Sequence, residues 1–148
     1  MSLSINRRLA AIGIRVAPPM RLADSFEADI ESTLLDALEE FGRTRDGRLI
    51  ALLGSWIKVH GEFAICEKLG SFARRREAER PGSALFLPVL AGLAVRDGLH
   101  KWKALALRRR KPVFLYGEEV TRSAIELKGR MPWLAGLNIH AAEGSIRI

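Results

Sequence analysis

The sequence has few of the residues and motifs that mark catalytic, metal-binding or membrane proteins. Cys66 is the only cysteine in 148 residues, so neither an intrachain disulfide nor a multi-cysteine zinc site can form. There is no glycine-rich phosphate loop, no H-E-x-x-H or G-x-S-x-G motif, and no apolar run near the roughly 20 residues of a membrane-spanning helix. These absences favour a cytoplasmic, non-enzymatic protein without a cofactor or a membrane partner. An enzyme with no familiar motif, acting on a phosphorylated substrate, stays open as an alternative to a binding protein.

Three histidines are the remaining candidates for metal ligation: His60, His100 and His140. His60 and His100 both flank expected turns, where a histidine caps backbone carbonyls or faces water. We therefore expect no metal site. Cys66 lies beside an apolar stripe, so we expect a small buried hydrophobe rather than a reactive thiol.

The positive charge of the chain is unevenly distributed. The formal net charge is +7 at pH 7, but residues 1–47 carry −2 and residues 48–148 carry +9. A surface of this kind attracts polyanions such as nucleic acid or an acidic protein. The acidic segment near the start can repel such partners or cover the basic part.

The early part of the chain predicts a basic arm followed by an acidic helix. Residues 1–23 contain four arginines and no acidic residue, a bias that is also compatible with a transit peptide. Apolar residues at three- and four-residue steps then predict a helix with one apolar stripe: Phe26, Ile30, Leu34, Ala37, Leu38 and Phe41. Asp24 and Glu27 form a capping-box-like start, and Gly42 is the expected end.

Two helical hairpins are expected next, completing a helical domain over residues 24–111. In the first, a buried helix over 49–59 ends at Gly61, and a helix with Ile65, Leu69 and Phe72 inward finishes in Arg74-Arg75-Arg76. In the second, Ser83 is the expected N-cap, Pro88 must lie in the first turn and Gly98 ends the helix. A last helix from Leu99 leads into Arg108-Arg109-Arg110-Lys111.

The two hairpins resemble each other in sequence. A shift of 37 residues places Trp56 on Leu93 and Gly61 on Gly98. Such a period is typical of two-helix solenoid repeats, but two copies are fewer than the three that usually bury a continuous core. True repetition and chance alignment both stay open.

Residues 112–148 predict a small α+β unit packed on this mainly α domain. Residues 113–116 favour a strand ended by Gly117, and residues 118–127 a helix with Val120, Ala124 and Leu127 inward. A short helical turn begins at Pro132, and a closing hairpin is expected from residues 139–142 and 145–148. These are the parts of a winged helix and of many unrelated folds. A strand at the very end is compatible with a piece of a longer protein.

Basic residues at the ends of the two hairpins form the candidate binding site: Arg74, Arg75, Arg76, Lys101, Lys103, Arg108, Arg109, Arg110 and Lys111. If the hairpins stack in parallel, both basic ends emerge at one edge and can follow a phosphate backbone. The hypothesis is non-enzymatic binding of nucleic acid, DNA above all, in a regulatory or accessory role. Further cations of the last unit could contribute: Arg122, Lys128, Arg130 and Arg147.

Two alternatives stand beside this hypothesis. The basic groups can be solvated helix ends, satisfied by the helix dipole and by Glu77 and Glu79. The chain can also be a helical-repeat scaffold whose concave face receives an acidic segment, from a protein partner or from its own acidic helix. The three tryptophans lie on or beside apolar stripes, so we expect core anchors rather than base-stacking groups.

Overall fold

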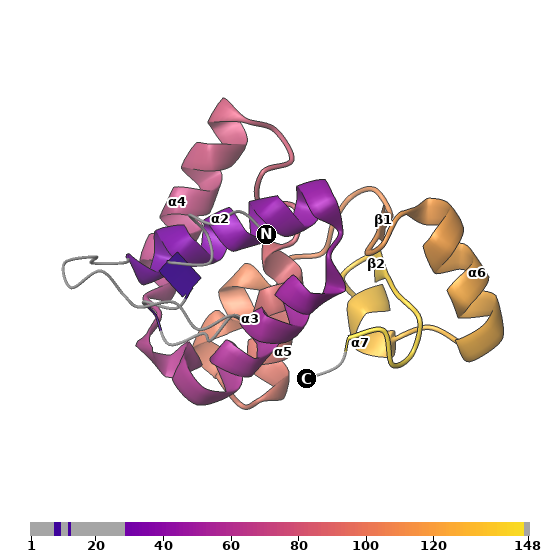
Figure 1. Ribbon diagram of the computed structural model, residues 1–148. Coiled ribbons are helices and arrows are strands. Elements are labelled where there is room, and N and C mark those ends of the chain that lie inside the picture. Colours follow the sequence, from indigo (N-terminus) through magenta and orange to yellow (C-terminus); the bar gives the residue numbers. More distant parts are fainter. Residues whose placement is uncertain (1–7, 10–11, 13–28, 147–148) are drawn as a thin grey trace.

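The computed structural model describes residues 8, 9, 12 and 29–146 (Figure 1). The expected basic arm and the Asp24–Glu27 capping box lie outside these residues, apart from Arg8, Leu9 and Ile12, and so does Arg147. The described chain is mainly helical with a small two-stranded parallel sheet, which confirms the fold class in its coarse form. Its elements are α2 (Ile30–Thr44), α3 (Gly47–His60), the 3-10 turn η1 (Gly61–Phe63), α4 (Cys66–Glu79), α5 (Leu87–Arg96), the 3-10 helix η2 (His100–Leu105), β1 (Val113–Phe114), α6 (Glu118–Lys128), α7 (Pro132–Ala135) and β2 (Ile139–His140).

The core lies between α3, α5 and the helices that cover them. Helix α5 is buried from Leu87 to Ala94, and Pro88 lies in its first turn as predicted, where a missing amide donor costs no helical hydrogen bond. Trp102 of η2 is fully buried and its indole nitrogen donates to the Gly61 carbonyl at 3.0 Å. Trp56 is also buried, so two of the three tryptophans are confirmed as core anchors. Trp133 packs against this core from a partly buried position.

Several helix ends differ from the prediction. Helix α2 passes Gly42 and ends at Thr44, because Arg45 adopts the left-handed conformation with φ of 54° and closes the helix. Helix α5 is capped by Phe86 rather than by Ser83, which lies in the preceding turn. Ile65 was expected inward but precedes α4 and is 57% exposed. The stops at Gly61 and Gly98 are confirmed.

The second expected hairpin is only half helical. After Gly98 the chain forms the six-residue 3-10 helix η2, and residues 106–112 that follow belong to neither helix nor strand. The predicted helix into the second basic cluster is therefore wrong, and Lys101 and Lys103 do not share a helix with Arg108 and Arg110. Repetition of the 14-residue helix α4 in the second hairpin is not confirmed.

The last unit is built around a parallel pair of strands instead of a closing hairpin. β2 pairs with β1, placing Val113 opposite Ile139 and Phe114 opposite His140. Ala142, expected in the hairpin, forms an antiparallel bridge with Arg130. In Figure 1 the unit lies to one side of helices α2 to α5, and Arg45 joins the two parts by donating to the Phe114 and Leu115 carbonyls at 2.7 and 2.9 Å.

Helix α6 faces the opposite way from the prediction. Val120 and Leu127, expected inward, are 66% and 85% exposed, whereas Thr121 is buried. The hydroxyl of Thr121 accepts a hydrogen bond from the Tyr116 amide at 3.2 Å, which fixes the start of α6 against the end of the β1 segment. This contact turns another face of α6, the one that carries Arg122, towards Phe114.

No helix in the described part of the chain is both long and apolar enough to cross a membrane.

Candidate nucleic-acid interface

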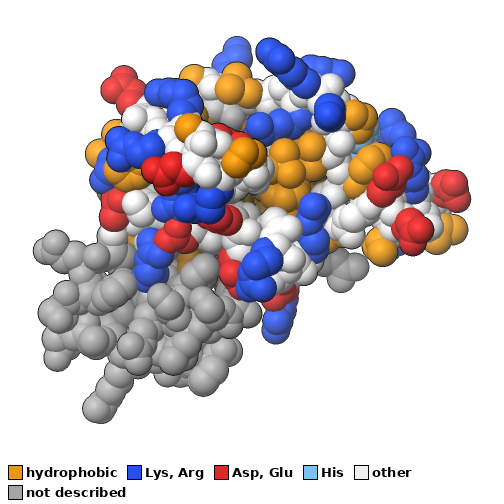
Figure 2. Space-filling model, turned by 90° about the horizontal axis from the view of Figure 1, so that it is seen from above, with side chains coloured by type: hydrophobic (Ala, Val, Ile, Leu, Met, Phe, Trp, Pro, Cys, Tyr) orange, Lys and Arg blue, Asp and Glu red, His pale blue; other side chains and the backbone are white. Residues whose placement is uncertain are grey.

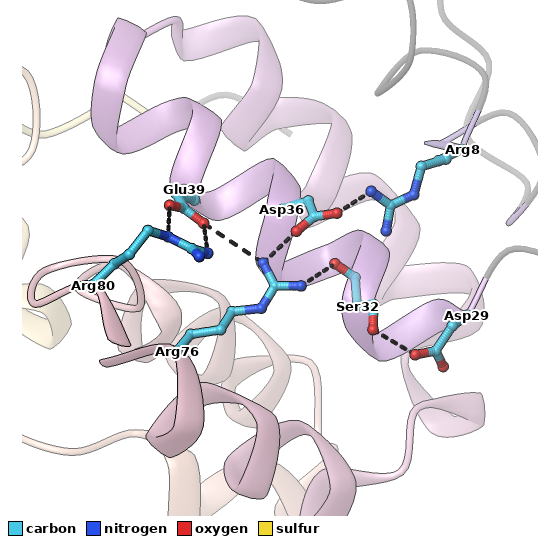
Figure 3. Close-up of polar contacts among 7 residues, drawn as sticks. All are labelled: Arg8, Asp29, Ser32, Asp36, Glu39, Arg76 and Arg80. Atoms are coloured by element: carbon cyan, nitrogen blue, oxygen red, sulfur yellow. Dashed lines mark hydrogen bonds and ion pairs between the residues drawn. The ribbon is translucent and has the colours of Figure 1, made fainter. Parts of the chain in front are cut away.

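The arginines near the end of α4 are in part neutralised by the acidic helix α2. Arg76, partly buried, forms ion pairs with Asp36 and Glu39, and Arg80 bonds both carboxylate oxygens of Glu39 at 2.9 and 3.0 Å (Figure 3). Arg8 reaches the other oxygen of Asp36. The prediction that the acidic helix could cover part of the basic surface is confirmed by these pairs.

A shallow hollow of about 410 Å³ lies over this network and is lined by Ser32, Asp36, Phe72, Arg75, Arg76, Glu79 and Arg80. Acidic and basic groups alternate around it, so its charges largely compensate one another. Arg74 and Arg75 are exposed, and within the described chain neither forms an ion pair. Arg75 lies over the Phe72 ring, 5.5 Å from its centre, so α4 presents two of its three candidate arginines to solvent.

The lysines of η2 have different surroundings. Lys101 caps the end of the η1 turn, where its ammonium donates to the carbonyls of Glu62 and Ala64. Lys103 is exposed. Lys101 therefore serves partly to close a turn, and Lys103 is left to solvent.

The second basic cluster, residues 108–111, begins beside the segment that follows α7. Arg108 donates to the Gly136 carbonyl at 3.3 Å and is otherwise exposed. Arg109 is half-buried: its guanidinium donates to the Ala84 carbonyl at 2.8 Å, its amide donates to the Leu137 carbonyl, and burial lowers the pKa of its side chain. Arg110 and Lys111 are exposed. Arg109 is thus a structural cation, and its neighbours are available to a ligand.

A group of planar side chains lies on the outer side of the β1–β2 pair. Phe114 and His140 are opposite each other in the strand register, with ring centres 5.5 Å apart and planes inclined by 35°. The guanidinium of Arg122, from α6, lies 4.9 Å from the centre of the Phe114 ring. Asn138 holds the other edge of the imidazole through a contact of 3.2 Å between its side-chain oxygen and Nε2 of His140.

Three arginines from three separate segments are near enough to His140 for their charges to act on it: Arg108, Arg122 and Arg130, which we call the arginine cluster. Burial lowers the pKa of His140, and the positive charges of Arg130, Arg122 and Arg108 lower it further. In the described residues the one carboxylate that pairs with any of the three is Glu118, 3.0 Å from Arg122, and both partners are exposed. The arginine cluster therefore carries a net positive charge.

Figure 2 shows how charged side chains are distributed over one face of the molecule, where acidic and basic groups also lie together at the right-hand end. In Figure 2, Asp and Glu alternate with Lys and Arg on the left part of the visible face, whereas Lys and Arg side chains follow its upper margin without acidic neighbours. Charge on this protein is thus locally compensated in one area and uncompensated in another.

The sequence prediction found only part of this cluster. Arg108 belonged to the proposed site and Arg122 and Arg130 to its possible extension, but nothing in the linear order joined them to Phe114 and His140. The signal lies in the parallel pairing of two strands that are distant in the chain, since Val113 pairs with Ile139, 26 positions later.

The described residues contain no group of three or more His, Cys, Asp and Glu side chains that could hold a metal ion. Cys66 is partly buried at the start of α4, and burial raises the pKa of its thiol, which keeps the thiol protonated. No protein-family model, curated protein or solved structure matches this chain.

Proposed function

We propose that the protein binds nucleic acid without catalysing a reaction, and that ligand phosphates contact the arginine cluster together with Arg110 and Lys111. The observation that carries this proposal is the position of Arg122, which lies over the Phe114 ring beside His140 and is exposed like Arg108 and Arg130. The charges of all three arginines act on His140, and the described residues show a single, exposed carboxylate partner for them. Like charges held together repel one another, and a phosphate oxygen relieves that repulsion while accepting their hydrogen bonds.

The arrangement of the hydrogen bonds supports this role. Arg108 is oriented by a backbone carbonyl, which accepts a hydrogen bond without cancelling the positive charge. Arg122 lies against an aromatic ring, which orients its plane in the same way. Guanidinium groups that are already oriented lose less conformational freedom on binding than freely moving ones.

A charge-matched pair of triple variants tests the proposal. Arg108→Gln/Arg122→Gln/Arg130→Gln removes the arginine cluster, while Arg43→Gln/Arg48→Gln/Arg80→Gln removes three arginines that form ion pairs with Glu40, Asp46 and Glu39. Both variants lose the same net charge. Binding of short labelled single-stranded and duplex DNA is measured by fluorescence anisotropy over a series of salt concentrations.

We expect the first variant to lose most of its affinity and about two to three units of the slope of log K against log salt, since each phosphate contact contributes nearly one unit. The second variant should keep the slope of the wild type. Equal losses in both variants would mean that net charge, and not the arginine cluster, governs binding. No binding of either DNA by the wild type would remove the proposal.

A scaffold for an acidic protein segment is the second candidate, and one observation favours it: α4 already binds an acidic helix, α2, through Arg76 and Arg80. In that case an acidic peptide with the sequence of residues 29–44 should compete with nucleic acid for the protein. Binding to an apolar groove would instead depend little on salt.

A further inference from the structure

We infer that the nucleic acid is single-stranded, and that an unpaired base stacks on the planar group formed by Phe114, His140 and Arg122. This inference rests on the proposed function, because it names the class of nucleic acid that the arginine cluster binds. It comes from a juxtaposition that the linear sequence does not show.

The position of the aromatic rings is the first reason. Four large aromatic side chains in the described part of the chain are buried in the core: Phe41, Trp56, Phe86 and Trp102, none of which is more than 3% exposed. Phe114 and His140 instead keep part of their surface in solvent, although they are on adjacent paired strands. Partly exposed rings side by side offer a flat apolar surface of the kind on which bases stack.

The position of Arg122 is the second reason. Its guanidinium lies over the face of the Phe114 ring, 4.9 Å from the ring centre, and a guanidinium plane is itself a stacking surface for bases. Arg108 and Arg130 are near the opposite ring, that of His140. A base on the rings would therefore lie near several cations, to which the phosphates before and after it can bind.

The strand state of the ligand follows from this geometry. In a duplex both faces of each base are covered by its neighbours, so a ring cannot stack on a base without separating them. A single strand presents its bases at no such cost. Base stacking accepts any base, so the inference predicts a strand preference and little sequence preference.

A second Phe–His pair in the molecule is a matched control. The rings of His60 and Phe63 are 6.1 Å apart and inclined by 39°, close to the geometry at the arginine cluster, and Phe63 is 61% exposed. Within the described residues no arginine lies over this second pair. It therefore has the aromatic surface without an arginine over a ring, although the Lys101 ammonium lies nearby on the Glu62 and Ala64 carbonyls.

The experiment compares four ligands of equal length by fluorescence anisotropy at one salt concentration: oligothymidylate, oligouridylate, an abasic DNA strand and a duplex. The abasic strand has the same phosphates and lacks the bases. We expect the wild type to bind the first two about tenfold more tightly than the abasic strand, from one stacked base. Equal affinity for DNA and RNA strands would indicate stacking alone, while a preference for RNA would indicate an added contact to the 2′-hydroxyl.

The variants assign the preference to the rings. Phe114→Leu/His140→Gln should bind all four ligands about as weakly as the wild type binds the abasic strand, because the arginines remain. His60→Gln/Phe63→Leu should behave as the wild type. Circular dichroism checks that each variant is folded.

Two outcomes overturn the inference: equal wild-type affinity for oligothymidylate and the abasic strand, or a preference that survives in the folded Phe114→Leu/His140→Gln variant. The wild-type comparison decides the matter even if that variant does not fold. Failure of the proposed function looks different, because the wild type would then bind none of the four ligands.

Discussion

Two regions of this protein contain similar numbers of arginines but use them differently. Along α2 and α4, Arg8, Arg76 and Arg80 form ion pairs with Asp36 and Glu39. Around β1 and β2, Arg108 and Arg109 bond backbone carbonyls. A carboxylate neutralises a guanidinium, whereas a carbonyl satisfies its hydrogen bonds and leaves the charge. The net charge of a segment therefore says little about how much of that charge a ligand can reach.

The difference also separates stability from binding. The side chain of Arg76 is 18% exposed, so its carboxylate partners compensate a desolvated charge and matter to the fold. The exposed cations of the arginine cluster contribute little to stability and can be changed without unfolding the protein. Four predictions test this comparison, in order of the size of their effects.

The largest effect is expected in the buried core on which both regions pack. Trp102→Ala removes a fully buried indole and its hydrogen bond to the Gly61 carbonyl. We expect the free energy of unfolding to fall by about 3–5 kcal/mol. Urea denaturation followed by circular dichroism measures this loss. Because both regions pack on one core, we expect one unfolding transition that shifts as a whole to lower urea concentration. Two separate unfolding transitions, of which only one shifts, would mean that the regions are independent domains.

Removing the carboxylates should turn the compensated region into a second polyanion-binding surface. Asp36→Asn/Glu39→Gln leaves the partly buried Arg76 without its partners, and we expect a loss of about 1–3 kcal/mol in the free energy of unfolding. Freed cations should also make binding of DNA more salt-dependent, by nearly one unit of slope for each cation that contacts a phosphate. Glu62→Gln/Glu67→Gln is the control, since it removes the same charge from exposed carboxylates. Identical slopes in both variants would contradict the masking of α4 by α2.

Two single substitutions, one in each region, compare the effect on stability with the effect on DNA affinity. Arg76→Gln should reduce stability and leave the affinity for single-stranded DNA unchanged. Arg108→Gln should change stability by less than about 0.5 kcal/mol and lower the salt slope by about one unit. Thermal unfolding and anisotropy on the same samples give both quantities. The reverse assignment, with Arg76 governing affinity, would place the binding surface on α4.

The sequence predicted the helical part better than the last unit, for physical reasons. Helices are specified by local periodicity, so α2, α3 and α4 could be located from apolar spacing, and Gly61 and Gly98 could be assigned as stops. Helix α6 could be located as well, but its orientation could not. Its apolar residues Val120 and Leu127 form a regular stripe, yet a contact between Thr121 and Tyr116 turns that stripe to solvent.

The sequence could predict which residue types belong to the candidate site, but not where they meet. Arginine at positions 108, 122 and 130 was visible in the sequence, but their meeting point depends on the parallel pairing of β1 with β2. Local patterning favoured a hairpin at the end of the chain, because adjacent strands usually pair. The ion pairs of Asp36 could not be predicted either, because its partners Arg8 and Arg76 are 28 and 40 positions away in the chain.

The smallest effect concerns the histidine within the arginine cluster. Burial and the charges of Arg130, Arg122 and Arg108 lower the pKa of His140 below its ordinary value of about 6.5. The folded protein then binds fewer protons than the unfolded chain as pH falls through that ordinary value, so this group reduces stability at acidic pH and has no effect well above it. His140→Gln should make the free energy of unfolding less sensitive to pH between neutral and mildly acidic conditions. Ring titration by NMR gives the direct check: the pKa of His140 should rise in Arg108→Gln/Arg122→Gln/Arg130→Gln, and an unchanged pKa would mean that the three arginines do not act on this ring.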